Sequence, residues 1–200
     1  MGGGLDKNRG DELQDFPIVK MPQVDTSEWL KPASEEKLHT LIQTPGGDFE
    51  LYRLPALRKS VQAKAESWEK WRLSFGGADV LVVEDAAAPW VSLHKRMRAG
   101  IHGRLEGDIL KGFARRSLLP SRRIVEFTVG DSSLKFEVKG LSVNLIRENS
   151  DGGRHLIART RRGRWQSDGL DQQEMAVACL YSAAGLDVFL ESPLWDIPLF

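Results

Sequence analysis

The sequence predicts an α+β fold: an antiparallel β-barrel-like meander wrapped around a buried hydrophobic C-terminal helix, with one or two helices near the N-terminus. Two observations carry this prediction. Residues 122–166 alternate apolar and polar side chains between short turns, which is the pattern of half-buried strands. Residues 175–190 have a helical composition but hold only two strongly polar side chains, Ser182 and Asp187, which point to different sides of a helix. A helix without a polar face must be surrounded.

The length and composition indicate one globular domain with appended segments. The chain has 200 residues, of which 41% are hydrophobic and 28% charged, enough for a real core. We therefore divide it into an N-terminal arm with a short helix (1–48), a single barrel domain with a central helix at 171–190 (49–191), and a C-terminal tail (192–200).

The N-terminal elements follow from local patterns. Residues 1–24 hold too few apolar side chains to fold alone, and we expect an extended arm. Ser34 as an N-cap, followed by two glutamates, predicts a short helix that ends at Pro45. Residues 49–54 alternate like a strand, with Phe49, Leu51 and Leu54 inward. The apolar spacing over 57–75 predicts an amphipathic helix, although its last part, "WEKWRLSF", fits a strand equally well.

The middle of the chain predicts strands. The run "ADVLVVED" (78–85) is rich in β-branched residues and indicates a buried strand. Residues 92–120 give conflicting signals, because apolar side chains recur every four positions while four glycines interrupt the pattern; we expect strands and turns there. From residue 122, the segments "RRIVEFTV", "SLKFEV", "VNLIREN" and "RHLIARTRRGRW" predict a meander of four antiparallel strands.

The C-terminal helix has a specific start. Asp171 is a good N-cap, and Glu174 three residues later completes a capping box. The apolar run that follows covers about 16 residues, short of the roughly 20 that a bilayer requires, and has no basic flank. Its small side chains would let strands approach closely. We therefore expect the upstream strands to curl into a barrel around it.

The charge distribution suggests a binding surface. Lys and Arg total 28, as do Asp and Glu, but residues 1–48 carry 5 basic and 9 acidic side chains while residues 94–123 carry 9 basic and 2 acidic. These basic clusters would attract the phosphates of lipid or nucleic acid. The other reading is that they pair with the acidic arm and tail of the same chain. The candidate anion-binding or lipid-binding residues are Lys95, Arg96, Arg98, Arg115, Arg116, Arg122, Arg123, Arg159, Arg161, Arg162 and Arg164.

No motif for catalysis, metal or cofactor binding is found. His94 and His102 are eight residues apart and lack a local ligand pattern for zinc. Glu106 and Asp108 flank a turn glycine and are expected to be solvated. There is no Gly-x-Ser-x-Gly sequence and no phosphate-binding glycine loop. The single cysteine, Cys179, lies in the apolar helix. We predict a protein that is not an enzyme and has no cofactor.

The expected location is the cytoplasm, with a peripheral association with the membrane as part of the lipid hypothesis. One cysteine excludes a disulfide within the chain, which is typical of a reducing compartment. The first 13 residues have no apolar core of the kind found in signal peptides.

The meander and the terminal helix, from "RRIVEFTV" to "DVFLES", resemble the tubby C-terminal-like superfamily, which includes tubby proteins, phospholipid scramblases and plant LURP-one-related proteins. The resemblance covers about the last third of the chain and is one of pattern. It implies a barrel around a central hydrophobic helix and binding to phosphoinositides or a membrane surface. No binding residue can be carried over individually, and the cysteine cluster of scramblases is absent. A pleckstrin-like barrel with a C-terminal helix is the competing fold.

Three functional hypotheses follow. The first is a non-catalytic binding or scaffold domain that engages an anionic lipid or membrane surface through the basic clusters. The second is a structural assembly protein that docks on partner subunits through residues 1–48 and 192–200. The third is nucleic-acid binding through "ARRSLLPSRR" and "RTRRGRW", with Trp165 as a base-stacking residue.

Overall fold

The computed structural model describes residues 14–19, 36–54, 68–87 and 93–191. This part of the chain forms strands β1 (Gln14–Pro17), β2 (Lys37–Thr44), β3 (Gly47–Leu54), β4 (Trp68–Phe75), β5 (Ala78–Ala87), β6 (Ile101–Leu105), β7 (Asp108–Arg115), β8 (Ile124–Val129), β9 (Ser132–Lys139), β10 (Ser142–Glu148), β11 (Arg154–Arg161) and β12 (Arg164–Ser167). It also forms helices α1 (Leu93–Ala99) and α2 (Gln172–Ala183) and the 3₁₀ helices η2 (Pro120–Arg122) and η3 (Leu186–Phe189).

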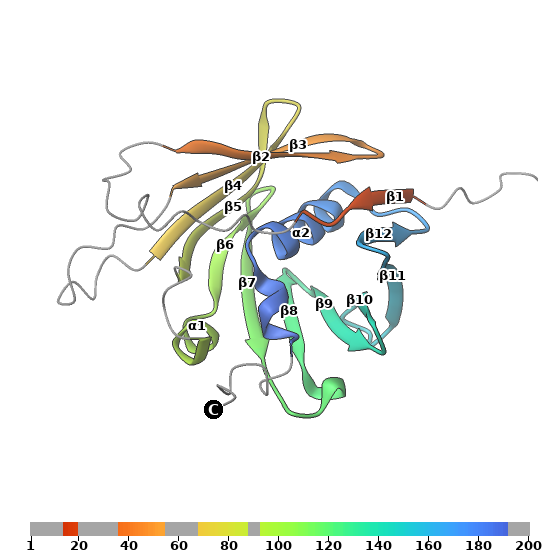
Figure 1. The fold of residues 1–200 in the computed structure, drawn as a ribbon. Coiled ribbons are helices and arrows are strands. Elements are labelled where there is room, and N and C mark those ends of the chain that lie inside the picture. The colour runs from red at the N-terminus through yellow and green to blue at the C-terminus, as the bar shows by residue number, and fades with distance from the viewer. Residues whose placement is uncertain (1–13, 20–35, 55–67, 88–92, 192–200) are drawn as a thin grey trace, which may run out of the picture.

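The twelve strands form a nearly closed antiparallel barrel (Figure 1). The sheet order is β1-β12-β11-β10-β9-β8-β7-β6-β5-β4-β3-β2, so every strand from β2 to β12 pairs with its neighbours in sequence. The first strand departs from this order, because β1 pairs with β12 and places Phe16 opposite Trp165. The two edge strands, β1 and β2, lie side by side without a hydrogen-bonded ladder. The predicted barrel is therefore confirmed.

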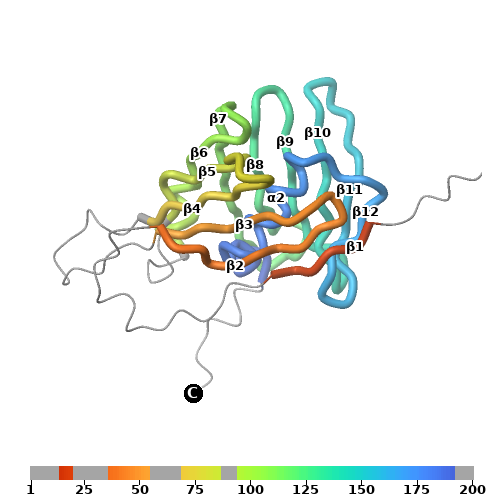
Figure 2. The backbone as a smooth tube through the Cα atoms, turned by 90° about the horizontal axis from the view of Figure 1, so that it is seen from above, coloured from red at the N-terminus to blue at the C-terminus, as the bar shows by residue number. Residues whose placement is uncertain are grey.

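The meander places alternate connections at the same end of the barrel. One end carries the connections from β5 to β6, β7 to β8, β9 to β10 and β11 to β12, and we call it the basic end; its described segments are 93–100, 116–123, 140–141 and 162–163. The opposite end carries the other hairpin turns and the start of α2. Figure 2 shows the turns β6–β7, β8–β9 and β10–β11 together along one margin.

Alternation along the strands fills the interior. In β3 the side chains of Phe49 and Leu51 are buried, as predicted, but the third inward position is Arg53, and Leu54 is only half-buried. The largest fully buried side chains are Trp71, Trp165, Phe16, Phe49, Phe127 and Phe136. A continuous apolar core inside the sheet accounts for its curvature.

Close packing explains the glycines between residues 100 and 112. A Cβ on Gly103 would lie 2.1 Å from the carbonyl oxygen of Val82 on β5, so only glycine lets β5 and β6 pair there. Gly100 and Gly107 have φ angles of 71° and 95°, which favour glycine. The predicted strands and turns are confirmed as β6 and β7, whereas Leu93–Ala99 is a helix.

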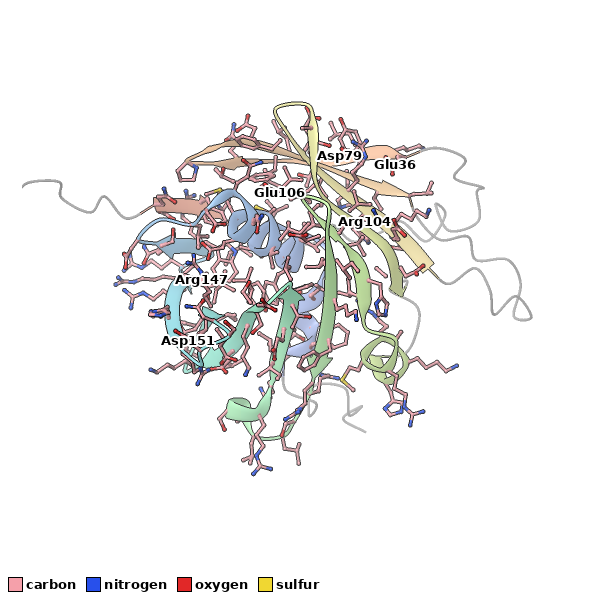
Figure 3. All side chains as sticks on the ribbon, turned by 180° about the vertical axis from the view of Figure 1, so that it is seen from behind. Glu36, Asp79, Arg104, Glu106, Arg147 and Asp151 are labelled. Carbon is pink, nitrogen blue, oxygen red and sulfur yellow. The ribbon has the colours of Figure 1, made fainter. Side chains whose placement is uncertain are left out.

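Helix α2 begins as predicted. The Asp171 carboxylate accepts a hydrogen bond from the Glu174 N–H (2.8 Å), and the Glu174 carboxylate accepts one from the Asp171 N–H (3.0 Å). The Arg147 guanidinium on β10 also pairs with the Glu174 carboxylate. In Figure 3, Arg147 is labelled beside this end of the helix. The capping box and this ion pair fix the helix start against the sheet.

Every residue of α2 from Glu174 to Ala183 is buried. The Tyr181 ring stacks on Phe136 of β9 with ring centroids 4.0 Å apart, and the Trp165 indole N–H of β12 donates to the Ser182 hydroxyl (3.3 Å). The helix is shorter than predicted. It ends at Ala183, Gly185 adopts a left-handed conformation (φ 65°), and η3 covers part of the segment assigned to the helix.

The N-terminal predictions are largely wrong. Residues 37–44, expected in a short helix, form strand β2, because Ile42 is buried in the core and opposite Phe49 of β3. Of the expected helix at 57–75, the part "WEKWRLSF" is strand β4, which confirms the alternative that the sequence left open; the first part lies outside the described residues. The sheet begins inside the expected arm, with β1. The segment "RHLIARTRRGRW" is two strands, β11 and β12, joined by a turn.

Candidate functional site

The barrel brings the predicted basic residues together at the basic end. Lys95, Arg96 and Arg98 lie on α1, four others border the β7–β8 connection, and the last four border the β11–β12 turn. These segments are up to about 70 residues apart in sequence. The antiparallel meander places all three connections at the same end of the barrel.

Seven of the eleven predicted residues are exposed, and their side chains make no hydrogen bond or ion pair with another residue that the structure describes. They are Lys95, Arg98, Arg115, Arg122, Arg159, Arg161 and Arg162. Lys139, next to the β9–β10 turn, is exposed in the same way. A cation without an internal partner is available for an anion from outside.

The side chains of the other four predicted residues are buried, half-buried or paired within the chain. The Arg123 side chain is buried and donates to the backbone carbonyls of Ser117 (2.7 Å), Leu118 (2.9 Å) and Leu190 (3.4 Å). The Arg164 guanidinium pairs with the Asp15 carboxylate of β1 (2.8 Å). Arg116 is half-buried.

Arg96 lies partly inside the barrel, with its guanidinium carbon 5.1 Å from the ring centroid of Phe189. Burial lowers the pKa of the Arg96 guanidinium, while the charges of Glu69 and Asp187 act in the opposite direction. We assign Arg96 to the packing between α1 and η3.

The opposite end of the barrel is acidic. Its turns and the start of α2 carry the exposed carboxylates Asp48, Asp79, Glu106, Asp108, Asp131, Asp151, Asp168 and Asp171. Figure 3 shows Glu106 next to Arg104, an exposed cation on this side of the molecule. The Glu106 carboxylate accepts a hydrogen bond from the Gln173 side chain (2.7 Å). The net charge of the chain is therefore near zero although one end of the barrel is basic and the other is acidic.

A mainly apolar cavity near the end of α2 is small. Its free volume is about 30 Å³, and its lining is mainly apolar, with Glu69 and Arg96 as the charged members. This is room for about one water molecule, far below the several hundred Å³ of a typical small-molecule site. The surface at the basic end is therefore a stronger candidate than this cavity.

The candidates for other chemistry do not assemble into a site. The described residues contain no group of three His, Cys, Asp or Glu side chains able to hold a metal ion. Burial raises the pKa of the Cys179 thiol well above its ordinary range. Trp165 is fully buried, so the predicted stacking of this side chain on a nucleic-acid base is wrong.

Two features could not be foreseen from the sequence pattern. Arg53 and Glu69 form a buried ion pair in the barrel. Leu118, Leu119 and Leu141 are exposed at the basic end, between the exposed cations. The sequence does not show which apolar side chains are exposed, so the exposure of these leucines is known only from the fold.

Comparisons with known proteins do not add a family. The sequence matches no family model and no curated protein, and the fold matches no solved structure. None of the helices among the described residues has the length and hydropathy to cross a bilayer.

Proposed function

We propose that the chain is a non-catalytic binding domain that engages an anionic lipid or membrane surface through the basic end. The observation that carries this proposal is the set of seven exposed cations named above, whose side chains have no partner among the described residues, on three connections at one end of the barrel. Each basic residue near an anionic membrane contributes about 1 kcal/mol of binding, so several together suffice for stable association.

The charge difference between the ends supports an oriented complex. Carboxylates concentrate at the opposite end, so an anionic surface would repel that end while it attracts the basic one. Orientation needs no deep pocket, which agrees with the small size of the cavity near α2.

The resemblance to the tubby C-terminal-like superfamily supports the same proposal. That group is expected to combine an antiparallel barrel with a central hydrophobic helix. We propose that the strands of this chain enclose α2 in that way. The complete burial of Glu174–Ala183 and the contacts of Tyr181 with Phe136 and Trp165, from strands β9 and β12, support it.

The competing reading, in which the arginines pair within the chain, has limited support. Arg164 pairs with Asp15, but the seven exposed cations have no such partner among the described residues. The acidic segments before residue 14 and after residue 191 lie outside the described residues.

The test is co-sedimentation with phosphatidylcholine vesicles that contain or lack phosphatidylserine, across a series of salt concentrations. We expect pelleting with the anionic vesicles that weakens as salt rises. The variant Arg161→Glu/Arg162→Glu should bind at least about 25-fold more weakly, at about fivefold for each basic residue lost. Arg104→Glu, one charge reversal at the acidic end against two at the basic end, is the control and should bind like the parent. Absence of pelleting at low salt would reject the proposal.

A second candidate, assembly with a protein partner, is favoured by the edge strand β2. Leu38 and Leu41 are exposed on this strand, and its outer edge lies beside β1 without a hydrogen-bonded ladder. Exposed edges can pair with another strand. Light scattering of the parent and of Leu41→Lys tests this: a higher-order species lost in the variant would support assembly, and a monomer in both would contradict self-assembly.

A further inference from the structure

Three exposed leucines occupy two neighbouring connections of the basic end. Leu118 and Leu119 in the β7–β8 connection are 66% and 53% exposed, and Leu141 in the β9–β10 turn is 108% exposed. The two connections are neighbours, because β8 pairs with β9 and η2 lies against β9. Scattered surface leucines are ordinary, but a leucine at the tip of a two-residue turn is not, since turns favour Gly, Asn and Asp.

The β7–β8 connection is held in place from inside. The buried Arg123 guanidinium donates hydrogen bonds to the backbone carbonyls of Ser117 and Leu118. The Leu119 N–H donates to the Ser117 hydroxyl (3.2 Å). These bonds turn the backbone polar groups toward the protein. The two leucine side chains are thus presented to solvent by an ordered loop, which lowers the entropy lost when they bind.

Cations flank both leucine positions. Arg115 and Arg122 border the β7–β8 connection, and Lys139 precedes the β9–β10 turn; all three are exposed. Exposed leucines flanked by cations match the two zones of one leaflet of an anionic bilayer, which are the phosphate layer and the hydrocarbon beneath it. The phosphates of RNA or DNA would satisfy the cations but would leave the leucines without an apolar environment.

We propose that Leu118, Leu119 and Leu141 enter the interfacial layer of an anionic bilayer while the flanking cations bind lipid phosphates. This deepens the function proposed above and rests on it. It fixes the partner as a bilayer instead of a free headgroup or nucleic acid. The barrel would stand with the β7–β8 and β9–β10 connections toward the membrane and its acidic end away from it.

The test separates insertion from electrostatic attraction. The variant Leu118→Ser/Leu119→Ser should lower the partition into phosphatidylserine-containing vesicles by about tenfold or more at constant salt, and should keep the salt dependence of the parent. Ile109→Ser is the matched control, because Ile109 is 68% exposed on β7 at the opposite end of the barrel. This control should bind like the parent. Circular dichroism checks that all variants fold.

A direct readout comes from a fluorophore at position 119. Cys179 is buried, so an environment-sensitive dye on Leu119→Cys labels one accessible thiol. We expect a blue shift on anionic vesicles and quenching by spin-labelled acyl chains, and neither for the dye on Ile109→Cys. Pelleting without a blue shift would overturn insertion and leave electrostatic binding intact. No pelleting at all would reject both proposals, and an RNA gel shift unchanged by the serine variant would assign the basic end to nucleic acid.

Discussion

Arg53 and Glu69 face each other inside the barrel, where their side chains are only 5% and 2% exposed. Arg53 Nε donates to Glu69 Oε2 (3.2 Å) and Nη2 donates to Oε1 (2.6 Å). Removing one partner of such a pair leaves a buried charge without compensation. We predict that Glu69→Gln lowers the free energy of unfolding by about 3–5 kcal/mol, measured by urea denaturation.

The double variant Arg53→Met/Glu69→Leu provides the control for that prediction. It removes both charges and replaces them with apolar side chains of similar size, so it should be clearly more stable than Glu69→Gln. An equal decrease in the free energy of unfolding of the two variants would show that side-chain shape, and not the uncompensated charge, determines the destabilisation at this position.

Cys179 reports on the burial of α2. The thiol lies within the helix, and burial raises its pKa, so the reactive thiolate is scarce at pH 8. We predict that the folded chain reacts with a thiol reagent at least about 100-fold more slowly than the chain in denaturant, where one thiol is titrated. Fast reaction of the folded chain would contradict the buried position of α2 and the enclosing barrel that we propose.

The helix and the meander could be predicted because their signals are local. The capping box of Asp171 and Glu174 lies within four residues, and the absence of a polar face is visible in the sequence itself. The strands β8 to β10 alternate with a period of two, which also needs no knowledge of distant residues.

The N-terminal half could not be predicted in the same way. Residues 37–44 carry a plausible helix signal, but pairing with β3 and burial of Ile42 override it. The Arg53–Glu69 pair joins residues 16 positions apart on neighbouring strands, which no local pattern reveals. Likewise, the basic residues were visible in the sequence, but their division into exposed and internally bound side chains depends on the fold.

Asp79 gives a prediction for pH dependence. The Arg72 guanidinium donates to its carboxylate (2.7 Å), as does the Ser74 hydroxyl (2.8 Å), and these bonds lower the pKa of Asp79. A lowered pKa stabilises the fold above the ordinary Asp value of about 4, and the contribution disappears as pH falls through the folded value. Because Asp79 is 48% exposed, we predict a loss of only about 0.5–1 kcal/mol for Asp79→Asn at pH 7.

Urea denaturation at pH 7 and pH 2.5 measures that difference. The gap between Asp79→Asn and the parent should shrink at the lower pH, because the contribution of the carboxylate decreases as pH falls below the ordinary Asp value of about 4. Asp131→Asn, a change at an exposed carboxylate whose side chain has no partner among the described residues, should be as stable as the parent at both pH values. A gap that stays constant with pH would mean that the carboxylate charge of Asp79 does not stabilise the fold.

Gly103 tests the close approach of β5 and β6. A methyl group there would lie 2.1 Å from the carbonyl oxygen of Val82 and 2.9 Å from the Cα of Val83, both backbone atoms that cannot move without displacing β5. Glycine is therefore required by packing, since Gly103 does not have a positive φ angle. We predict that Gly103→Ala lowers the free energy of unfolding by about 3 kcal/mol or more.

Gly46→Ala is the matched control for this substitution. Gly46 also lacks a positive φ angle, and a Cβ there would meet only the terminal methyl of Met175, at 4.0 Å. Its alanine variant should stay within about 0.5 kcal/mol of the parent in urea denaturation. If Gly103→Ala were equally harmless, β5 and β6 could not pair as closely as described, and the continuity of the barrel through β6 would have to be abandoned. If only Gly103→Ala is destabilised, the glycine-rich segment is a structural hairpin of the barrel wall.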